Sequence, residues 1–358
     1  MSAVIFEHVV KRYGAGGRPA VDDCSLTVEE GQLVVLLGPS GCGKTTLLKM
    51  VNRIIEPTAG RILVDDTDIQ TLPATELRRR IGYVIQQIGL FPHMSVEDNV
   101  ATVPRLLHWD KTRIDRRIDE LLDLVNLPPA TYRKRRPRQL SGGEQQRVGI
   151  ARAMAADPAL LLMDEPFGAI DAITRTHLQD EMLHIQQQVH KTILFVTHDV
   201  EEALRLADVL VVMCDGRILQ AGAPRDILAH PADAFVAELV GADDPLRRLS
   251  LVPVAEIMQP LGRRDADAQP EGWDTDLGLK APGGLARPSG RGESVAGNGH
   301  TISTTEDART ALGLLVGDRA ARVTVVDDDG RPVGTVSLDD IEAAAGVGAG
   351  AETGVHRP

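Results

Sequence analysis

Cysteine and aromatic residues are scarce in this sequence of 358 residues. Its three cysteines, Cys24, Cys42 and Cys214, are far apart, odd in number and form no CxxC pair. Neither a disulfide framework nor a zinc site is therefore expected, and the pattern fits a reducing cytosol. Aromatic residues make up only 3% of the chain, so its core has to be built mainly from Val, Ile, Leu and Ala.

Long apolar runs are also missing. The longest candidates, Leu33–Leu37 and Val209–Cys214, have the length of buried strands, far below the roughly 18 residues that cross a bilayer. The first residues, Met1–Glu7, show no basic stretch followed by an apolar one, so no signal peptide is expected. Any membrane role is therefore expected to come through a partner.

Positive charge is in the minority, and the formal net charge is −12. Binding to nucleic acid needs a basic face, so nucleic acid is not expected as a partner. One basic run, Arg133–Arg138, could favour an anionic membrane surface. A solvated face is the commoner explanation of such a run, and we prefer it.

Short apolar runs alternate with longer amphipathic stretches over about residues 1–240. This alternation predicts a doubly wound α/β domain whose parallel sheet is covered on both faces. The predicted strands are 33–37, 160–163, 193–197 and 209–213, and the predicted helices are 44–52, 111–124, 142–155, 173–190 and 200–206.

The composition changes after this region. We expect a first domain over 1–241, a linker with a Gly- and Pro-rich, disordered insert over 242–300, a small α+β unit over 301–345 and a flexible tail over 346–358. Within the small unit, the pattern predicts a helix, two strands around a turn at Asp328-Asp329-Gly330, and a final helix. Their predicted ranges are 305–316, 322–326, 333–336 and 338–345.

The strongest local signal is a phosphate-binding loop, which runs Gly38-Pro39-Ser40-Gly41-Cys42-Gly43-Lys44-Thr45-Thr46 and fits GxxxxGK[ST]. It follows a predicted strand and opens a predicted helix, so backbone N–H groups and the helix N-terminus can surround phosphates. In such a loop, Lys44 reaches the terminal phosphates and Thr45 ligates Mg²⁺. An ordinary glycine-rich turn is the alternative, and the correct flanks argue against it. The sequence thus predicts a nucleotide triphosphate with Mg²⁺.

Two further patterns fit nucleotide chemistry without establishing it. Asp164 and Glu165 end an apolar run, where the first could hold Mg²⁺ and the second could polarise an attacking water. Two exposed acids at a strand end would look the same. Ser141-Gly142-Gly143 opens a helix and is either a second anion site or a plain helix N-cap. Sequence physics alone leaves these alternatives open.

Taken together, the motifs resemble the ABC ATPase family over about residues 4–241. The phosphate loop, LSGGEQQ at 140–146 and LLLMDEP at 160–166 occur in the family's order and spacing. Four single residues match as well. Gln86 matches the Q-loop glutamine and Asp171 the D-loop aspartate, while His198 matches the switch histidine and Tyr13 the aromatic residue that stacks on adenine.

This resemblance implies a P-loop NTPase fold with a helical subdomain at about 87–155. It implies an active ATP hydrolase that pairs head to tail as a homodimer, each ATP lying between the phosphate loop of one subunit and the signature segment, Ser141-Gly142-Gly143, of the other. The implied catalytic residues are Glu165, His198 and Lys44, and the implied metal ligands are Thr45, Gln86 and Asp164. The implied ATP-binding residues are Tyr13, the loop 38–46, Gln86, Ser141, Gly142, Gly143 and Asp171.

The family also implies partners. They are transmembrane permease subunits and, through the complex, a periplasmic or lipid-anchored solute-binding protein. The chain would lie peripherally on the cytoplasmic face of the cell membrane. Gln86 would link the ATP site to the membrane subunits.

Two segments, Ile81–His93 and Met163–Arg175, resemble one branch of the family. That branch imports quaternary amines such as glycine betaine, carnitine, choline or proline. Residues 301–345 resemble a CBS motif, which the branch often carries as a pair, whereas only one is recognisable here. We weigh two roles for residues 301–345 equally: the unit either only aids dimerisation, or it senses ionic strength or a nucleotide.

Other functions compete with this interpretation. An importer for another small solute, such as an amino acid, fits the same motifs. A soluble ABC ATPase acting on ribosomes or DNA usually carries two ATPase units or a long coiled-coil insertion, and the sequence shows neither. A pure regulatory module is disfavoured by the complete catalytic set. The solute itself is selected by the membrane and solute-binding subunits, so this sequence does not specify it.

Overall fold

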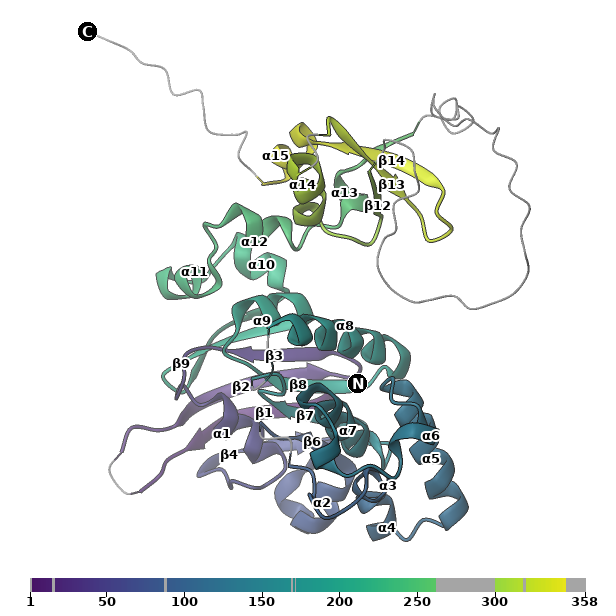
Figure 1. Cartoon of the computed structure of the whole chain (residues 1–358). Helices are drawn as coiled ribbons and strands as arrows, with labels where there is room; N and C mark the ends of the chain where they lie inside the picture. Colours follow the sequence, from purple (N-terminus) through teal and green to yellow (C-terminus); the bar gives the residue numbers. More distant parts are fainter. Residues whose placement is uncertain are drawn as a thin grey trace, which may run out of the picture. The chain divides into compact units, whose positions relative to one another are not determined.

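The computed structural model of the chain describes residues 2–14, 17–86, 89–168, 170, 172–261, 300–317 and 320–345 (Figure 1). The chain splits into two compact units, which meet in sequence between Val240 and Gly241. Most of the predicted insert, the predicted tail and Asp171 lie outside the described residues.

A six-stranded sheet in the order β10-β9-β3-β8-β7-β6 is the centre of the first unit. Five neighbouring strands run parallel and only β10 is antiparallel, on an edge. Every position of β3, β7 and β8 is buried, as expected for apolar runs in a covered parallel sheet. The bounds are β3 Leu33–Leu37, β6 Ile81–Val84, β7 Leu160–Asp164, β8 Thr192–Val196, β9 Val209–Cys214 and β10 Arg217–Gly222.

The four predicted strands are confirmed to within one residue at each end, and they are neighbours in the parallel part of this sheet, as predicted. A second, antiparallel sheet has the order β2-β1-β4-β5. Its strands alternate buried and exposed residues, a weaker signal than a continuous apolar run. The bounds are β1 Ser2–Lys11, β2 Val21–Glu29, β4 Ala59–Val64 and β5 Thr67–Asp68.

Helix α1, Lys44–Val51, lies between the two sheets. It contacts β7 and β8 of the first sheet and β4 of the second. Leu47, Leu48, Met50 and Val51 are completely buried in the core that the sheets share. Because α1 is packed on several sides, the loop that opens it is held at a defined place.

The remaining helices of this unit surround the sheets, and the group α3–α6 gathers beside α7 (Figure 1). Helix α5 shows why such helices form: Asp110 caps its first turn, and its apolar residues repeat at helical spacing on one buried face. The bounds are α2 Ala74–Arg80, α3 Val96–Val100, α4 Thr102–Leu106, α5 Lys111–Leu124, α6 Pro129–Tyr132, α7 Gly142–Met154, α8 Ala172–Val189, α9 Val200–Leu206, α10 Pro224–Ala229 and α11 Ala234–Val240, with 3-10 turns at Ile69–Thr71 and Pro137–Gln139.

The second unit has its own mixed sheet in the order β11-β14-β13-β12 and its own core. The helix predicted from residue 305 begins at Ala308, because Asp307 caps the N–H of Thr310. Gly330 has a φ of 77° in the predicted turn between β13 and β14. The bounds are β11 Gln259–Pro260, β12 Thr301–Ser303, β13 Arg322–Val326, β14 Pro332–Ser337, α12 Pro245–Leu249, α13 Val254–Ile257, α14 Ala308–Gly317 and α15 Leu338–Ala345.

Across the described part of the chain, no helix combines the length and apolar character that a membrane span requires.

Candidate functional site

The predicted phosphate loop joins β3 to α1, and close contacts with its backbone require glycine at two positions. A Cβ at Gly38 would lie 2.1 Å from the carbonyl oxygen of Met213, and a Cβ at Gly43 would lie 2.3 Å from that of Ala20. Gly43 also has a φ of 107°, in the left-handed region that side chains disfavour. The loop is therefore pressed against two neighbouring segments, which hold its backbone in place.

Lys44 is buried in this loop, with only 4% of its surface exposed. Its ammonium donates to the carbonyl oxygens of Gly38 at 2.7 Å and Pro39 at 2.9 Å, and it lies 3.6 Å from Cys42 Sγ. Among the described residues, no carboxylate lies within ion-pair distance of it. A buried cation that has only neutral partners favours an anionic ligand.

Asp164 ends β7 directly behind the loop and is almost fully buried. The Thr45 hydroxyl donates to Asp164 Oδ1 at 2.8 Å, and Lys49 Nζ lies 3.3 Å from Asp164 Oδ2. Burial raises the pKa of the nearby Tyr83 hydroxyl, and the negative charge of Asp164 raises it further. Tyr83 therefore stays a neutral phenol, and the Asp164 carboxylate lies near two hydroxyls, those of Thr45 and Tyr83, and one cation, that of Lys49.

Glu165 brings together three segments that are distant in sequence. Gln86 Nε2 donates to Glu165 Oε2 at 2.9 Å, and His198 Nδ1 lies 3.2 Å from Glu165 Oε1. All three residues follow neighbouring parallel strands, β6, β7 and β8, whose carboxyl ends meet at one edge of the sheet. Glu165 has a φ of 45°, a strained conformation that its N–H bond to the carbonyl of Val196 helps to hold.

Ser141-Gly142-Gly143 forms the start of α7, which has 13 residues. Ser141 Oγ accepts from the N–H of Glu144 at 3.3 Å, and the Glu144 carboxylate accepts from the N–H of Ser141 at 2.7 Å. This reciprocal pair is a capping box. The space around Gly142 is open, and Ser141 and Gly142 are exposed.

The predicted residues do not all come together in one subunit. Among the hydrogen bonds of the described residues, none joins 141–143 to 38–46. Tyr13 is 57% exposed, with Lys11 Nζ 5.2 Å from the centre of its ring. The structure therefore assembles Lys44, Thr45, Asp164 and the Glu165 group, and leaves Tyr13 and the Ser141 segment as separate exposed surfaces.

Sequence reasoning missed Lys49 and Arg175. Lys49 lies four residues after Thr45 on α1, a spacing that places both side chains on one face of the helix. This spacing could have indicated that Lys49 belongs to the site. Arg175 donates to Asp199 at 3.2 Å and to the carbonyl of Ile170 at 3.0 Å, so it links the residue after His198 to the start of α8. No sequence pattern indicated that link.

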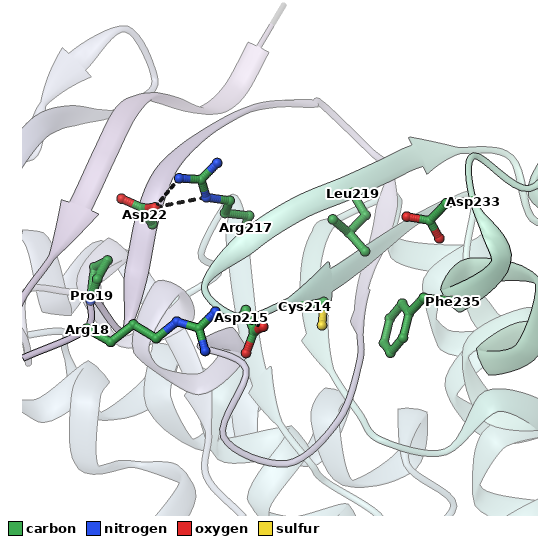
Figure 2. Close-up of a pocket in the computed structure, with 9 residues that line it drawn as sticks. All are labelled: Arg18, Pro19, Asp22, Cys214, Asp215, Arg217, Leu219, Asp233 and Phe235. Carbon is green, nitrogen blue, oxygen red and sulfur yellow. Dashed lines mark hydrogen bonds and ion pairs between the residues drawn. The ribbon is translucent and has the colours of Figure 1, made fainter.

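A separate pocket of about 520 Å³ lies around the turn between β9 and β10 (Figure 2). Ion pairs of Arg18 with Asp215 at 2.9 Å and of Arg217 with Asp22 at 2.6 Å lie along it. Four of the five charged side chains that line it are thus already neutralised in pairs, and the fifth, Asp233, accepts from the N–H of Val236 at 2.8 Å.

The same turn brings the three cysteines into one region. The Cys24 thiol donates to the carbonyl of Gly216 at 3.1 Å, the N–H of Gly216 donates to the carbonyl of Cys42 at 3.0 Å, and Cys214 lies at the end of β9. Residues that are far apart in the sequence are therefore neighbours behind the phosphate loop. All three are free thiols.

Comparison with known proteins agrees with this geometry. The family model of ABC transporters matches residues 21–168. The chain is 43% identical over 333 residues to the osmoprotectant import ATP-binding protein OsmV of Salmonella typhimurium, covering 92% of this chain and 78% of that protein. It is 44% identical to the glycine betaine uptake system ATP-binding protein YehX of Escherichia coli, covering 94% of this chain and 98% of that protein.

Solved structures resemble the first unit. The dimeric, post-hydrolysis state of an ATP-binding cassette bound to ADP and Pi superimposes with a TM-score of 0.55 at 31% identity. The match covers 62% of this chain and 98% of the other. With two relatives above 40% identity that are matched over most of their length, the motifs and the fold point to one family. The chain belongs to the ATP-binding subunits of the ABC transporter family.

Proposed function

We propose that this chain hydrolyses ATP to energise a membrane importer of quaternary-amine osmoprotectants, such as glycine betaine, carnitine, choline or proline. The observation that carries the proposal is the extent of the similarity to relatives named for osmoprotectant import and glycine betaine uptake. It covers 92% and 94% of this chain and so continues beyond the ATPase unit.

In this proposal, the phosphate loop and Lys44 bind the phosphates of ATP. The buried Lys44 ammonium and the glycine-dependent backbone support the assignment. Thr45, Asp164 and Gln86 would hold Mg²⁺, a cation that prefers oxygen ligands such as the hydroxyl, carboxylate and amide oxygens of these side chains. Bound Mg²⁺ neutralises charge that develops on the transferring phosphate.

Glu165 is proposed to orient and polarise the attacking water. Its two carboxylate oxygens are contacted by Gln86 and His198, which limits the orientations that the carboxylate can adopt. His198 is 56% exposed at its side chain and so can also reach a ligand. Catalysis here would depend mainly on position and charge, as in other phosphoryl transfers.

The second half of each ATP site is proposed to come from another copy of the chain. Ser141-Gly142-Gly143 is an exposed helix N-terminus, which favours anions. The matched cassette structure is dimeric. We propose that Asp171 and Tyr13 complete the nucleotide site. We further propose that permease subunits and a solute-binding protein complete the transporter, and that the chain lies on the cytoplasmic face of the membrane.

For the second unit, we propose a single CBS-like fold over 301–345 that aids dimerisation. Its strand–helix–strand–strand–helix order supports a small domain, whose apolar core also takes in Leu249 and Val254 of the preceding helices. The alternative role, nucleotide binding by this unit, is tested by titrating adenine nucleotides into a Lys44→Ala chain, in which binding at the phosphate loop is expected to be weak.

Alkylation of Cys42 is expected to abolish ATP binding. Its buried thiol lies 3.6 Å from Lys44 Nζ, so an added group has to displace the loop. The measurement is titration with a fluorescent ATP analogue after complete modification, verified by intact mass, in a chain whose other two thiols are Ser. Unreacted protein from the same batch is the control. Unchanged affinity of the modified chain would contradict the prediction.

The other two thiols are expected to react slowly even in the wild type. Burial raises the pKa of Cys24 to about 11, and burial also raises the pKa of Cys214. Both are therefore protonated at neutral pH, where the thiolate is the reactive form.

Uptake of labelled glycine betaine tests the proposed function. Cells that carry this subunit with its membrane partners should accumulate label, more so at high external osmolarity, and the Glu165→Gln variant should not. Competition by unlabelled carnitine, choline and proline then ranks the solutes. If both strains take up the label equally while the purified wild type hydrolyses ATP, the cargo is another solute, and an amino-acid panel becomes the next measurement.

A further inference from the structure

The carboxylate of Glu144 lies at the start of α7, where the proposed function requires an anion of the partner's nucleotide to bind. A helix N-terminus attracts negative charge, but a carboxylate already there repels a second anion. Glu144 is the third residue of the helix, and the N–H groups that precede it, those of Gly142 and Gly143, have no acceptor within the helix. The position of this carboxylate therefore affects how open the site is.

Both oxygens of the Glu144 carboxylate have specific partners. Tyr132 donates its hydroxyl to Glu144 Oε1 at 2.6 Å, and the N–H of Ser141 donates to Oε2 at 2.7 Å. The hydrogen bond from Tyr132 is the main cause that lowers the pKa of Glu144, so the group is ionised at neutral pH. Tyr132 therefore holds a full negative charge on the side of the helix start.

Tyr132 is itself held from the other side. The guanidinium of Arg135 lies 4.4 Å from the centre of the Tyr132 ring, and the positive charge of Arg135 also favours ionised Glu144. Next to it, Arg133 pairs with the carboxylates of Glu97 at 2.9 Å and Asp115 at 2.8 Å, which ties the segment to α3 and α5. The Tyr132 hydroxyl thus projects from an anchored segment.

We propose that Tyr132 is a positioning residue for the signature segment, Ser141-Gly142-Gly143: its hydroxyl fixes the Glu144 carboxylate against the N–H of Ser141, so that the carboxylate does not swing across this segment and the segment can receive the phosphates of the partner's ATP. The proposal rests on the two-subunit ATP site described above. It assigns to Tyr132, which lies outside the family motif at 140–146, a role in the affinity of the ATP-bound dimer.

The test measures ATP-driven dimerisation by sedimentation, in the slow-hydrolysing Glu165→Gln background. Tyr132→Phe keeps the ring that faces Arg135 and removes only the hydroxyl. Loss of one hydrogen bond to a charged group should raise the ATP concentration for half-maximal dimer roughly tenfold. Binding of a fluorescent ATP analogue to dilute monomer should not change, because the phosphate loop is untouched.

A second substitution separates charge repulsion from structural damage. Glu144→Gln can keep the capping box, which accepts Glu or Gln, but has no charge. Tyr132→Phe combined with Glu144→Gln should therefore dimerise within about twofold of the background chain. Added salt should also reduce the Tyr132→Phe defect, since it screens repulsion. A merely structural role predicts neither the rescue nor the salt effect.

The outcomes are distinguishable. Normal dimerisation of Tyr132→Phe, or a defect that Glu144→Gln does not repair, overturns the inference while the proposed function stands. Ser141→Arg supplies the other control, since it should block the anion site and abolish the ATP-dependent dimer. If Ser141→Arg dimerises as its parent does, the two-subunit site is wrong and the role of Tyr132 falls with it.

Discussion

Replacing Glu165 with Gln is expected to lower the rate of ATP hydrolysis by two to three orders of magnitude, within the range of about 10²–10⁴ that a general base contributes. The amide has nearly the same shape, so the strained backbone at Glu165 and the nearby side chains can remain in place. It cannot, however, take a proton from water. ATP binding should persist, because the phosphate loop and Asp164 are unchanged, and the ATP-bound dimer should accumulate.

The measurement is phosphate release by purified protein, together with binding of a fluorescent ATP analogue. Glu238→Gln is a matched control, since Glu238 is an exposed glutamate on α11 away from the site. It should hydrolyse ATP as the wild type does. Wild-type turnover in Glu165→Gln would remove Glu165 from its proposed role and direct attention to His198 as the group that acts on the water.

Substituting Lys44 with Ala is expected to weaken ATP binding by roughly two orders of magnitude. The cation is buried beside the glycine loop and has only neutral partners among the described residues, so its charge is available to the phosphates. Because Lys44 is buried, one charge–phosphate contact contributes several kcal/mol to binding, and each factor of ten in affinity corresponds to about 1.4 kcal/mol. Transport and hydrolysis should both be lost.

Thermal unfolding without nucleotide shows whether Lys44→Ala still folds. The carbonyls of Gly38 and Pro39 lose a donor, which costs about 1–3 kcal/mol if no water replaces it. The variant should therefore melt somewhat lower but cooperatively, and ATP should no longer raise its melting temperature. Lys134→Ala, at an exposed position, is the control. Unchanged ATP affinity in folded Lys44→Ala would contradict the assignment of the phosphate loop.

Four strands of the six-stranded sheet, β3, β7, β8 and β9, were predictable because each is a short, continuous apolar run that a covered parallel sheet requires, whereas the short β6 and the polar edge strand β10 were not predicted. Helices α5 and α9 were also predicted correctly, since they begin and end at their predicted residues. Strands β1, β2 and β4 were missed because one side of their sheet is partly exposed and their pattern is broken by polar residues. The loop at 38–46 was found because its spacing encodes its own local geometry.

The sequence by itself thus determined the chemistry of this protein: a glycine loop with its lysine, acids at the end of a strand, and a capped helix start, each specified by residues adjacent in the chain. Only the tertiary structure decided which of them meet. Parallel strands β6, β7 and β8 place Gln86 and His198 against Glu165, and packing of α6 beside α7 gives Glu144 its partner Tyr132. These contacts join residues with no periodic relation in sequence, so only the packed fold specifies them.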